Sequence, residues 1–389
     1  LGWLASLAIS LGAPTLSHAG APAAAPGGPA QAATLAPHDG FGLGPPPISP
    51  PPRHGPVITT TAPIKRLVIL GDSLSDDHRM WNARRTAWIP DPGLGYWKGR
   101  FTNGYNWVDH LRKLWPSLAI NNLAFGGAAS AGRYKSHFIY IPNLVDQLTT
   151  AVHSKLLASN LDTGVVIWIG ANDVLDHLDK KHPTAVKDLI MKNVNAVTAQ
   201  LVGKYKIPAN HVFVATLPPM DRVPYYVEKS HRGLAQAAST GIDATNAAIE
   251  QLARERGMTA IPAHTFIARW LDGTYRDPYM TNLTAACLPM DPDTAGKRGF
   301  NPLVSHKPKI NACKSTTNAF AMFFDTMHPT AVAHCGLSIL FKRYFQGGSL
   351  SGIDTTYCRT AKMSDVLPSP AASTRPVVAA HAPRAVAEA

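Results

Sequence analysis

The chain has 389 residues, 45% of them hydrophobic and 16% charged, with a formal net charge of +12 and a pI near 9.6. This length and composition indicate a globular protein with a substantial core, in one large or two ordinary domains. The basic residues are scattered, and there is no zinc-finger spacing or dense basic helix, which excludes a nucleic-acid reader. The positive charge favours anionic surfaces such as phospholipid, although an ordinary solvated basic surface explains it as well.

Residues 1–19 are apolar and end in Ser17-His18-Ala19, a small-x-small pattern. This pattern predicts the apolar region and cleavage site of a secretory signal peptide whose basic n-region is missing from the chain. A hydrophobic N-terminal helix is the alternative. Since no other segment is apolar enough to span a membrane, we expect a secreted or periplasmic protein.

The rest of the chain divides by composition into three parts. Residues 20–63 are rich in Ala, Pro and Gly and predict an extended or disordered linker. The folded domain is expected at residues 64–346. An Ala- and Pro-rich tail is expected at residues 347–389.

Within the folded domain, short apolar runs alternate with longer amphipathic segments. The runs are too short for helices and rich in β-branched residues, so they predict strands. Such an alternation indicates an α/β fold in which helices cover both faces of a parallel sheet. The predicted strands are residues 64–70, 118–123, 164–169, 211–217 and 258–262, and the predicted helices are residues 106–115, 142–157, 184–205, 233–256 and 330–345.

The first predicted strand ends at Gly71, and Ser73 follows it in a polar turn. In an open α/β sheet, active groups gather beyond the carboxyl ends of the strands, and the start of the next helix favours negative charge. Taken alone, the same stretch also fits a strand followed by a simple helix cap. The residues at two other strand ends, and an Asp-x-x-His segment before the last predicted helix, decide between the two interpretations.

Those residues form the set that a serine nucleophile needs. A serine hydroxyl requires a base within hydrogen-bond reach, and a third group must orient that base. The spacing of Asp325-x-x-His328 lets the carboxylate meet Nδ1 of the imidazole while Nε2 faces Ser73. The expected donors to an oxyanion are the backbone N–H groups of Ser73 and Gly126 and the side-chain amide of Asn172.

The sequence resembles the GDSL, or SGNH, family of serine esterases and lipases, because four blocks occur in the family's order. They are Gly-Asp-Ser-Leu-Ser at 71–75, Asn-x-x-Ala-x-Gly-Gly at 121–127, Gly-x-Asn-Asp at 170–173 and Asp-x-x-His-Pro at 325–329. The resemblance spans residues 64–345. It implies a three-layer α/β/α, flavodoxin-like domain with a five-stranded parallel sheet.

The resemblance also implies a role for each site residue. Ser73 is the nucleophile, His328 the base and Asp325 the acid that orients it. Gly126 and Asn172 complete the oxyanion hole, and the glycine doublet makes Gly127 the alternative to Gly126. No Cys-x-x-Cys or His-Glu-x-x-His spacing occurs, so we expect no metal or other cofactor.

Three neighbouring residues need separate interpretation. Asp76 and Asp173 are charged and adjacent to the predicted site, and we expect them to support it through hydrogen bonds. Ser130 lies in Ala-Ala-Ser-Ala-Gly, which misses the Gly-x-Ser-x-Gly nucleophile motif by its first residue.

The substrate class follows from finer similarities. Gly-Arg-Phe-Thr-Asn-Gly at 99–104, Leu-Pro-Pro and Phe-Phe-Asp-x-x-His-Pro-Thr look most like secreted bacterial phospholipase, lysophospholipase and acyltransferase members, and also occur in plant GDSL lipases. Residues 99–104 lie in an aromatic-rich stretch that fits either a wall beside an apolar substrate or simple packing. Asp77 departs from the Thr-Gly-Asn run of those relatives, which leaves the start of the substrate loop open.

We therefore expect hydrolysis or transfer of acyl groups from lipid esters, with peripheral contact to an anionic membrane surface. One alternative keeps the chemistry and changes the substrate to acetylated polysaccharide. The other is a non-catalytic secreted binding module on the same scaffold. The intact four blocks argue against the second alternative.

All four cysteines lie in the C-terminal third of the chain and allow three pairings. We expect the neighbouring pairs Cys287–Cys313 and Cys335–Cys358. The segment between the first pair is rich in Pro, Gly and Lys, so that disulfide is expected to enclose an exposed loop just upstream of Asp325. The loop is interpreted either as a gate over the site or as a structural staple.

Overall fold

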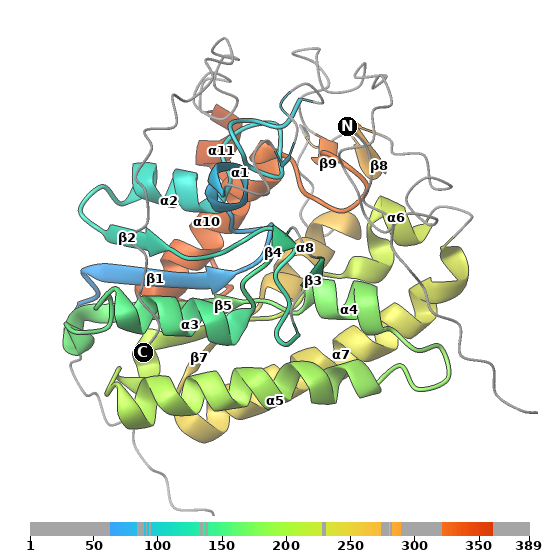
Figure 1. Cartoon of the computed structure of the whole chain (residues 1–389). Helices are drawn as coiled ribbons and strands as arrows, with labels where there is room; N and C mark the ends of the chain where they lie inside the picture. The colour runs from blue at the N-terminus through green and yellow to red at the C-terminus, as the bar shows by residue number, and fades with distance from the viewer. Residues whose placement is uncertain are drawn as a thin grey trace, which may run out of the picture. The chain divides into compact units, whose positions relative to one another are not determined.

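The computed structural model describes residues 63–83, 89–90, 92, 95–132, 135–136, 139–227, 231–273, 280, 282–288 and 321–360. The predicted signal peptide, nearly all of the predicted linker, Cys313 and the tail beyond residue 360 lie outside these ranges. Figure 1 colours the described elements along the chain.

A five-stranded sheet with every neighbouring pair parallel confirms the predicted sheet. Its order is β2 (Ala119–Asn122), β1 (Arg66–Gly71), β5 (Thr163–Trp168), β6 (Val212–Ala215) and β7 (Thr259–Ile261). Each strand overlaps one predicted run. β1 and β5 are almost wholly buried, as expected of parallel strands covered on both faces. Because all strands run the same way, their carboxyl ends meet at one edge, and the predicted site residues follow there.

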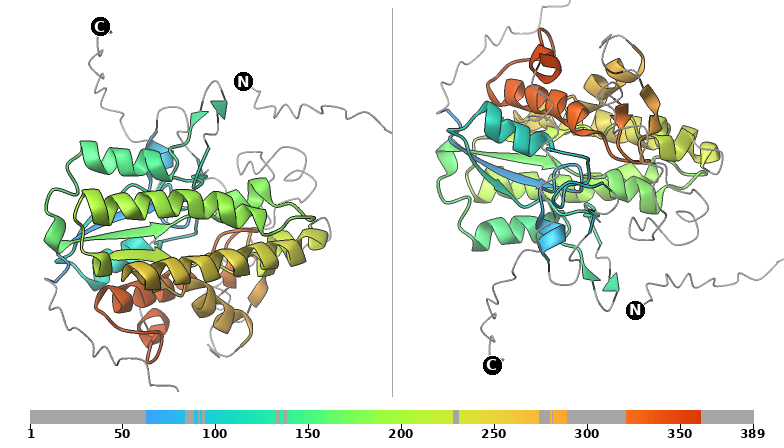
Figure 2. Two further views of the ribbon diagram at one scale, coloured as in Figure 1. Left: turned by 90° about the horizontal axis from the view of Figure 1, so that it is seen from below. Right: turned by 90° about the horizontal axis from the view of Figure 1, so that it is seen from above.

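Helices lie on both faces of this sheet, which confirms the three-layer α/β/α arrangement (Figures 1 and 2). One layer holds α3 (Leu144–His153), α5 (Ala185–Ala199) and α7 (Arg232–Arg256). The other holds α2 (Trp107–Leu114), α8 (Ala263–Leu271) and α10 (Ala331–Phe345). Within the layers, α5 packs along α7 and α2 packs along α10.

Capping residues define where two of these helices begin. Asn106 caps α2 and Asn143 caps α3, each accepting two backbone N–H groups of the first turn. Asp109 and Asp146 reach back to the cap residues, so both helices start with a full capping box. The start of α2 is thereby fixed beside the turn that carries Ser73.

The sequence does not predict several short elements. β8 (Asn282–Ala286) pairs in parallel with β9 (Ala321–Phe323), and β3 (Lys135–Ser136) pairs antiparallel with β4 (Ile139–Tyr140). Such short strands show no sequence period that separates them from loops. The other short elements are α1 (Arg79–Asn82), α4 (Ala171–His177), α6 (Pro224–Val227), α11 (Thr356–Thr360), the 3₁₀ turns Asn160–Asp162, Ala209–His211 and Met220–Arg222, and a π-helical turn, Gln200–Lys204.

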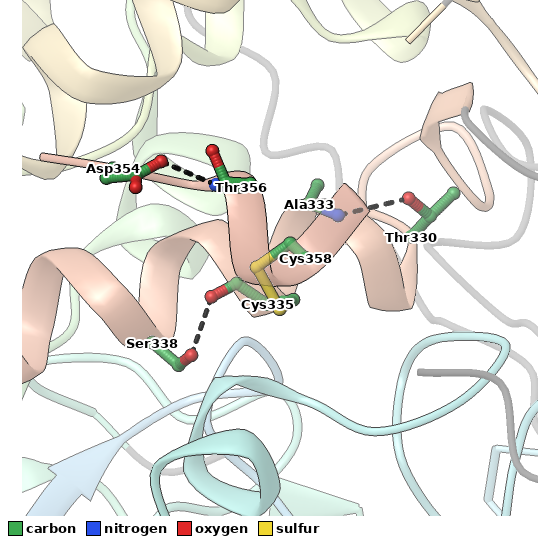
Figure 3. Close-up of a disulfide and its surroundings, with 7 residues drawn as sticks. All are labelled: Thr330, Ala333, Cys335, Ser338, Asp354, Thr356 and Cys358. Atoms are coloured by element: carbon green, nitrogen blue, oxygen red, sulfur yellow. Dashed lines mark hydrogen bonds between the residues drawn. A yellow bond between two sulfur atoms is a disulfide. The ribbon is translucent and has the colours of Figure 1, made fainter. Parts of the chain in front are cut away.

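The predicted Cys335–Cys358 disulfide joins α10 to α11 (Figure 3). Arg343 on α10 also donates to the backbone oxygens of Ser349 and Ser351. These contacts attach the chain as far as residue 358 to α10. The Cys287–Cys313 pairing and the gating loop involve residues outside the described ranges and stay predictions. Across the described residues, no helix combines the length and apolarity needed to cross a membrane.

Two buried histidines lie in the layer formed by α2 and α10. Trp107 of α2 stacks on Phe341 of α10 with ring centroids 4.2 Å apart. His110 on α2 and His334 on α10 are both buried in this layer. Burial lowers the pKa of His110 to about 4 and that of His334 to about 3. Both imidazoles are therefore neutral in the folded protein near pH 7.

Replacing His334 by glutamine is expected to weaken the loss of stability in acid. An unfolded histidine titrates near pH 6.5, so acid protonates it in the unfolded chain before the buried His334, and stability falls as the pH falls. Between about pH 7 and about pH 5 the loss is about 2 kcal/mol of unfolding free energy. Urea unfolding at the two pH values measures this loss as the difference between parent and variant. The difference is needed because burial raises the pKa of Asp72 to about 7, so the titration of Asp72 changes stability in the opposite direction.

Ser338 supplies a control without a titratable group, since it is buried on α10 and its hydroxyl donates to the backbone oxygen of Cys335. Ser338→Ala should lower stability by the same amount at both pH values and keep the pH dependence of the parent. An equal pH dependence in the parent and in His334→Gln would contradict the assignment.

Candidate active site

Ser73 lies at the carboxyl end of β1, where Gly71 and Gln147 fix the start of its turn. A Cβ at Gly71 would lie 2.8 Å from the backbone oxygen of Trp168 on β5, so a side chain does not fit there. Gln147, on the buried face of α3, accepts the Gly71 N–H at 2.8 Å and donates to the Gly71 carbonyl at 2.9 Å. This pair of hydrogen bonds anchors the end of the strand to α3.

The turn after Ser73 is held from two sides. Asn106, the cap of α2, donates to the backbone oxygen of Ser75 at 3.3 Å, and Asn122 at the end of β2 donates to the same oxygen at 2.7 Å. The indole N–H of Trp107 donates to the Ser75 hydroxyl at 3.0 Å. Side chains from α2 and β2 therefore fix the backbone that carries Ser73.

Ser73, His328 and Asp325 form one hydrogen-bonded line. His328 Nε2 lies 2.8 Å from Ser73 Oγ, and His328 Nδ1 lies 2.7 Å from Asp325 Oδ2. Asp325 Oδ1 accepts the backbone N–H groups of Met327 and His328, each at 2.7 Å. The Asp-x-x-His spacing therefore places the carboxylate and the imidazole as the sequence predicts.

Asp325 has a further donor that the sequence does not predict, the hydroxyl of Tyr96. This hydroxyl donates to Asp325 Oδ2 at 2.6 Å. Burial raises the pKa of Asp325, but the charge of His328 and the hydrogen bonds from His328 and Tyr96 outweigh it and leave the pKa below its ordinary value. The buried carboxylate is therefore charged, with hydrogen bonds on both oxygens.

Asn172 lies in the first turn of α4, just after β5. Its Nδ2 donates to the backbone oxygen of Ala128 at 2.8 Å. A side-chain amide nitrogen carries two protons, so this bond orients the amide and leaves a second N–H for a ligand. The geometry is compatible with the predicted role of Asn172 as an oxyanion donor.

The backbone N–H of Gly126 points elsewhere, in contrast to the expected oxyanion role. It donates to Oδ2 of Asp76 at 2.8 Å. Because a backbone nitrogen has one proton, Gly126 does not serve an oxyanion in this conformation. Among the described residues the N–H of Gly127 has no acceptor, and its φ of 75° lies in the region that favours glycine. We therefore move the proposed donor from Gly126 to Gly127.

The side chains around Gly126 leave no room for a Cβ at this position. A Cβ there would lie 2.5 Å from the ring of Phe101 and 2.7 Å from the sulfur of Met80. These side chains, rather than an oxyanion, exclude a larger residue. The Phe101 ring centroid also lies 5.2 Å from that of His328, so apolar groups border the site.

Asp76 and Asp173 are buried and support the site through hydrogen bonds, as the sequence predicts. Asp76 accepts the N–H of Arg79 at 2.6 Å as well as that of Gly126, so it joins the turn after Ser73 to the loop after β2. Asp173 accepts the N–H and the hydroxyl of Ser130 at 2.8 and 2.6 Å. Burial raises the pKa of both carboxyl groups.

Asp77, where the sequence departs from its relatives, lies in the loop between β1 and α1. Its buried carboxylate lies 2.7 Å from a guanidinium nitrogen of Arg112 on α2. The next residue, His78, has a φ of 143°, which non-glycine residues rarely adopt. The ion pair therefore ties this loop to α2 at a strained point of the backbone.

Sequence reasoning misses two residues that hold the site. Gln147 does carry a signal, because a polar side chain lies on the buried face of α3 between Leu144 and Leu148. Tyr96 carries none, because its partner Asp325 lies 229 positions away. Within the described residues, no group of three or more His, Cys, Asp or Glu side chains is arranged to hold a metal ion.

A family model described as GDSL-like Lipase/Acylhydrolase matches residues 67–335, a range that contains every predicted site residue. The phosphatidylcholine-sterol acyltransferase of Aeromonas hydrophila is 26% identical over 305 residues, covering 70% of this chain and 88% of that protein. The thermolabile hemolysin of Vibrio parahaemolyticus is 22% identical over 278 residues, covering 70% of this chain and 61% of that protein.

Among solved structures, a catalytic mutant of an acetylxylan esterase from Geobacillus stearothermophilus is similar to this chain. It is 14% identical, with a TM-score of 0.40, and the match covers 76% of this chain and 98% of that chain.

Proposed function

Because the chain belongs to the GDSL-like lipase/acylhydrolase family, we propose that it hydrolyses lipid acyl esters, or transfers their acyl groups, through an acyl-serine intermediate. The observation that carries this proposal is the line from Ser73 through His328 to Asp325, with contacts of 2.8 and 2.7 Å. Such a line makes a serine hydroxyl nucleophilic near neutral pH.

In the first half of the proposed reaction, Ser73 Oγ attacks the ester carbonyl carbon while His328 Nε2 takes its proton. The carbonyl oxygen becomes an oxyanion, which the N–H groups of Ser73 and Gly127 and the amide of Asn172 stabilise. The bond to the leaving alcohol then breaks, and the alcohol oxygen takes the proton from His328. The acyl group stays on Ser73.

In the second half, His328 removes a proton from water or from an acceptor alcohol, whose oxygen attacks the acyl carbon. Water gives hydrolysis and an alcohol gives transfer. The bond to Ser73 Oγ breaks, and Oγ recovers the proton from His328. Asp325 keeps the imidazole oriented and stabilises its positive charge in both halves.

Two observations favour a lipid acyl chain over an acetyl group. Apolar side chains border the proposed site: the Phe101 ring centroid lies 5.2 Å from that of His328, and Ile141 lies 3.1 Å from where a Cβ of Gly127 would be. The Aeromonas relative is a protein named for acyl transfer between phosphatidylcholine and sterol, and the match covers 88% of it.

We further propose that the protein works outside the cytoplasm, secreted or in the periplasm. The Cys335–Cys358 disulfide supports this, because disulfides persist mainly in oxidising compartments. The net charge of +12 suits peripheral contact with an anionic membrane, an attraction that salt weakens.

A series of p-nitrophenyl esters, from acetate through butyrate and octanoate to palmitate, tests the substrate class. We expect kcat/KM to rise from acetate to octanoate by roughly tenfold or more, since each buried methylene adds favourable binding. Phosphatidylcholine vesicles with and without cholesterol separate released fatty acid from sterol ester. Ser73→Ala serves as the blank.

Turnover of acetate alone would contradict the lipid proposal and favour the acetylated polysaccharide. Absence of turnover on every ester by the parent protein, with the fold intact, would indicate a non-catalytic binding module instead.

A further inference from the structure

The loop at residues 95–104 contacts both Asp325 and His328, as well as the first turn of α10. We propose that this loop positions the catalytic triad of Ser73, His328 and Asp325. In this role, Tyr96 holds the Asp325 carboxylate in the orientation that catalysis needs. This inference rests on the proposed function and adds a positioning residue to it. The sequence leaves the role of residues 99–104 open between a wall beside the substrate and simple packing, and this proposal gives the loop a positioning role.

The central contact is a shared oxygen. Asp325 Oδ2 accepts the Tyr96 hydroxyl at 2.6 Å and lies 2.7 Å from His328 Nδ1. Two donors on one oxygen, together with two backbone donors on Oδ1, leave the carboxylate no alternative rotation. The plane of the carboxylate, and with it the direction of the imidazole, is therefore fixed in part by Tyr96.

The Tyr96 ring is itself held tightly. Its exposed fraction is 2%. Its ring centroid lies 5.0 Å from that of Phe324 and 6.3 Å from that of Phe101, both in edge-to-face geometry. Burial, followed by the charge of Asp325, raises the pKa of Tyr96 well above its ordinary value, so the hydroxyl keeps its proton and remains a donor.

The rest of the loop is anchored to α2 and to the start of α10. Arg100 binds Asp109 of α2 through two hydrogen bonds of 2.9 and 2.8 Å. Asn103 Oδ1 accepts the backbone N–H of Ala331 in the first turn of α10 at 2.9 Å. The loop thus joins α2 to the start of α10, immediately after His328.

Tyr96→Phe tests the proposal by removing one hydroxyl and keeping the ring. We expect kcat on a short-chain ester to fall about tenfold with KM nearly unchanged, because the lost hydrogen bond is to a charged group and the buried tyrosine does not reach substrate. The lost donor leaves more negative charge on Asp325 Oδ2, which faces the imidazole, so the acidic limb of kcat/KM, which reports the catalytic base, should move to higher pH. A purely structural role would lower the amount of folded protein without moving that limb.

Tyr105→Phe is the matched control, since it removes a hydroxyl just after the same loop, from a ring that contacts Trp97 and His110. It should keep the parent kcat and pH profile. Arg100→Lys breaks the two hydrogen bonds with Asp109 and leaves the triad residues unchanged. It should lower kcat by a smaller factor than Tyr96→Phe does, at unchanged KM. Arg100→Lys decides the question if Tyr96→Phe fails to fold.

Parent-like kcat and pH profile in folded Tyr96→Phe would overturn the inference. So would a parent-like kcat in Arg100→Lys, if that variant has to decide. Neither result would affect the proposed function, which fails separately if Ser73→Ala keeps its activity.

Discussion

Ser73→Ala is expected to lower kcat by roughly four to six orders of magnitude while the protein stays folded. The hydroxyl is the proposed nucleophile, and its Oγ lies 2.8 Å from the imidazole that would take its proton. His328→Ala should cost nearly as much, and the double variant little more, because the two groups act as one unit. Steady-state kinetics on a soluble ester, with far-UV circular dichroism as the check of folding, measure the effect.

Ser75→Ala is the control in the same turn. The Ser75 hydroxyl accepts the Trp107 indole at 3.0 Å and takes no part in the proposed chemistry, so its loss should cost about tenfold at most. If folded Ser73→Ala retained more than a few per cent of the parent kcat, the nucleophile assignment would be wrong.

Asn172→Ala is expected to lower kcat by roughly 10²–10³-fold with little change in KM, the usual result of removing one oxyanion donor. The bond from its Nδ2 to Ala128 at 2.8 Å holds the amide in place before substrate arrives. The second N–H therefore meets the developing charge without reorganisation. Kinetics on the same soluble ester measure kcat and KM separately.

Asn193 provides a matched control, because its Nδ2 also donates to a backbone oxygen, that of Leu189 at 3.1 Å, within α5. Asn193→Ala should leave both constants unchanged. A raised KM with an unchanged kcat in Asn172→Ala would make Asn172 a substrate-binding residue and refute its place in the oxyanion hole.

The sheet and the proposed catalytic triad are predictable from the sequence for one physical reason. Buried parallel strands are short runs of β-branched and aliphatic residues, which end where glycine or a polar residue begins. The runs that end before Ser73 and Asn172 are of this kind. Because parallel strands share one carboxyl edge, residues far apart in the sequence must meet there, and His328 follows from its spacing to Asp325.

The remaining features depend on contacts that no local pattern encodes. Tyr96 looks like any aromatic loop residue until the fold brings it to Asp325, 229 positions away. The direction of the Gly126 N–H is set by Asp76, which lies 50 positions earlier. Neither spacing nor composition distinguishes Gly126 from Gly127 as a donor, because only the orientation of each peptide plane decides it.

Covalent capture of the nucleophile tests the central claim most directly. A p-nitrophenyl alkylphosphonate resembles the tetrahedral intermediate and leaves a stable adduct on an activated serine. After digestion, mass spectrometry should find one adduct, on Ser73, and none in Ser73→Ala. An adduct on Ser75 or Ser130, or no adduct on the active parent protein, would contradict the account.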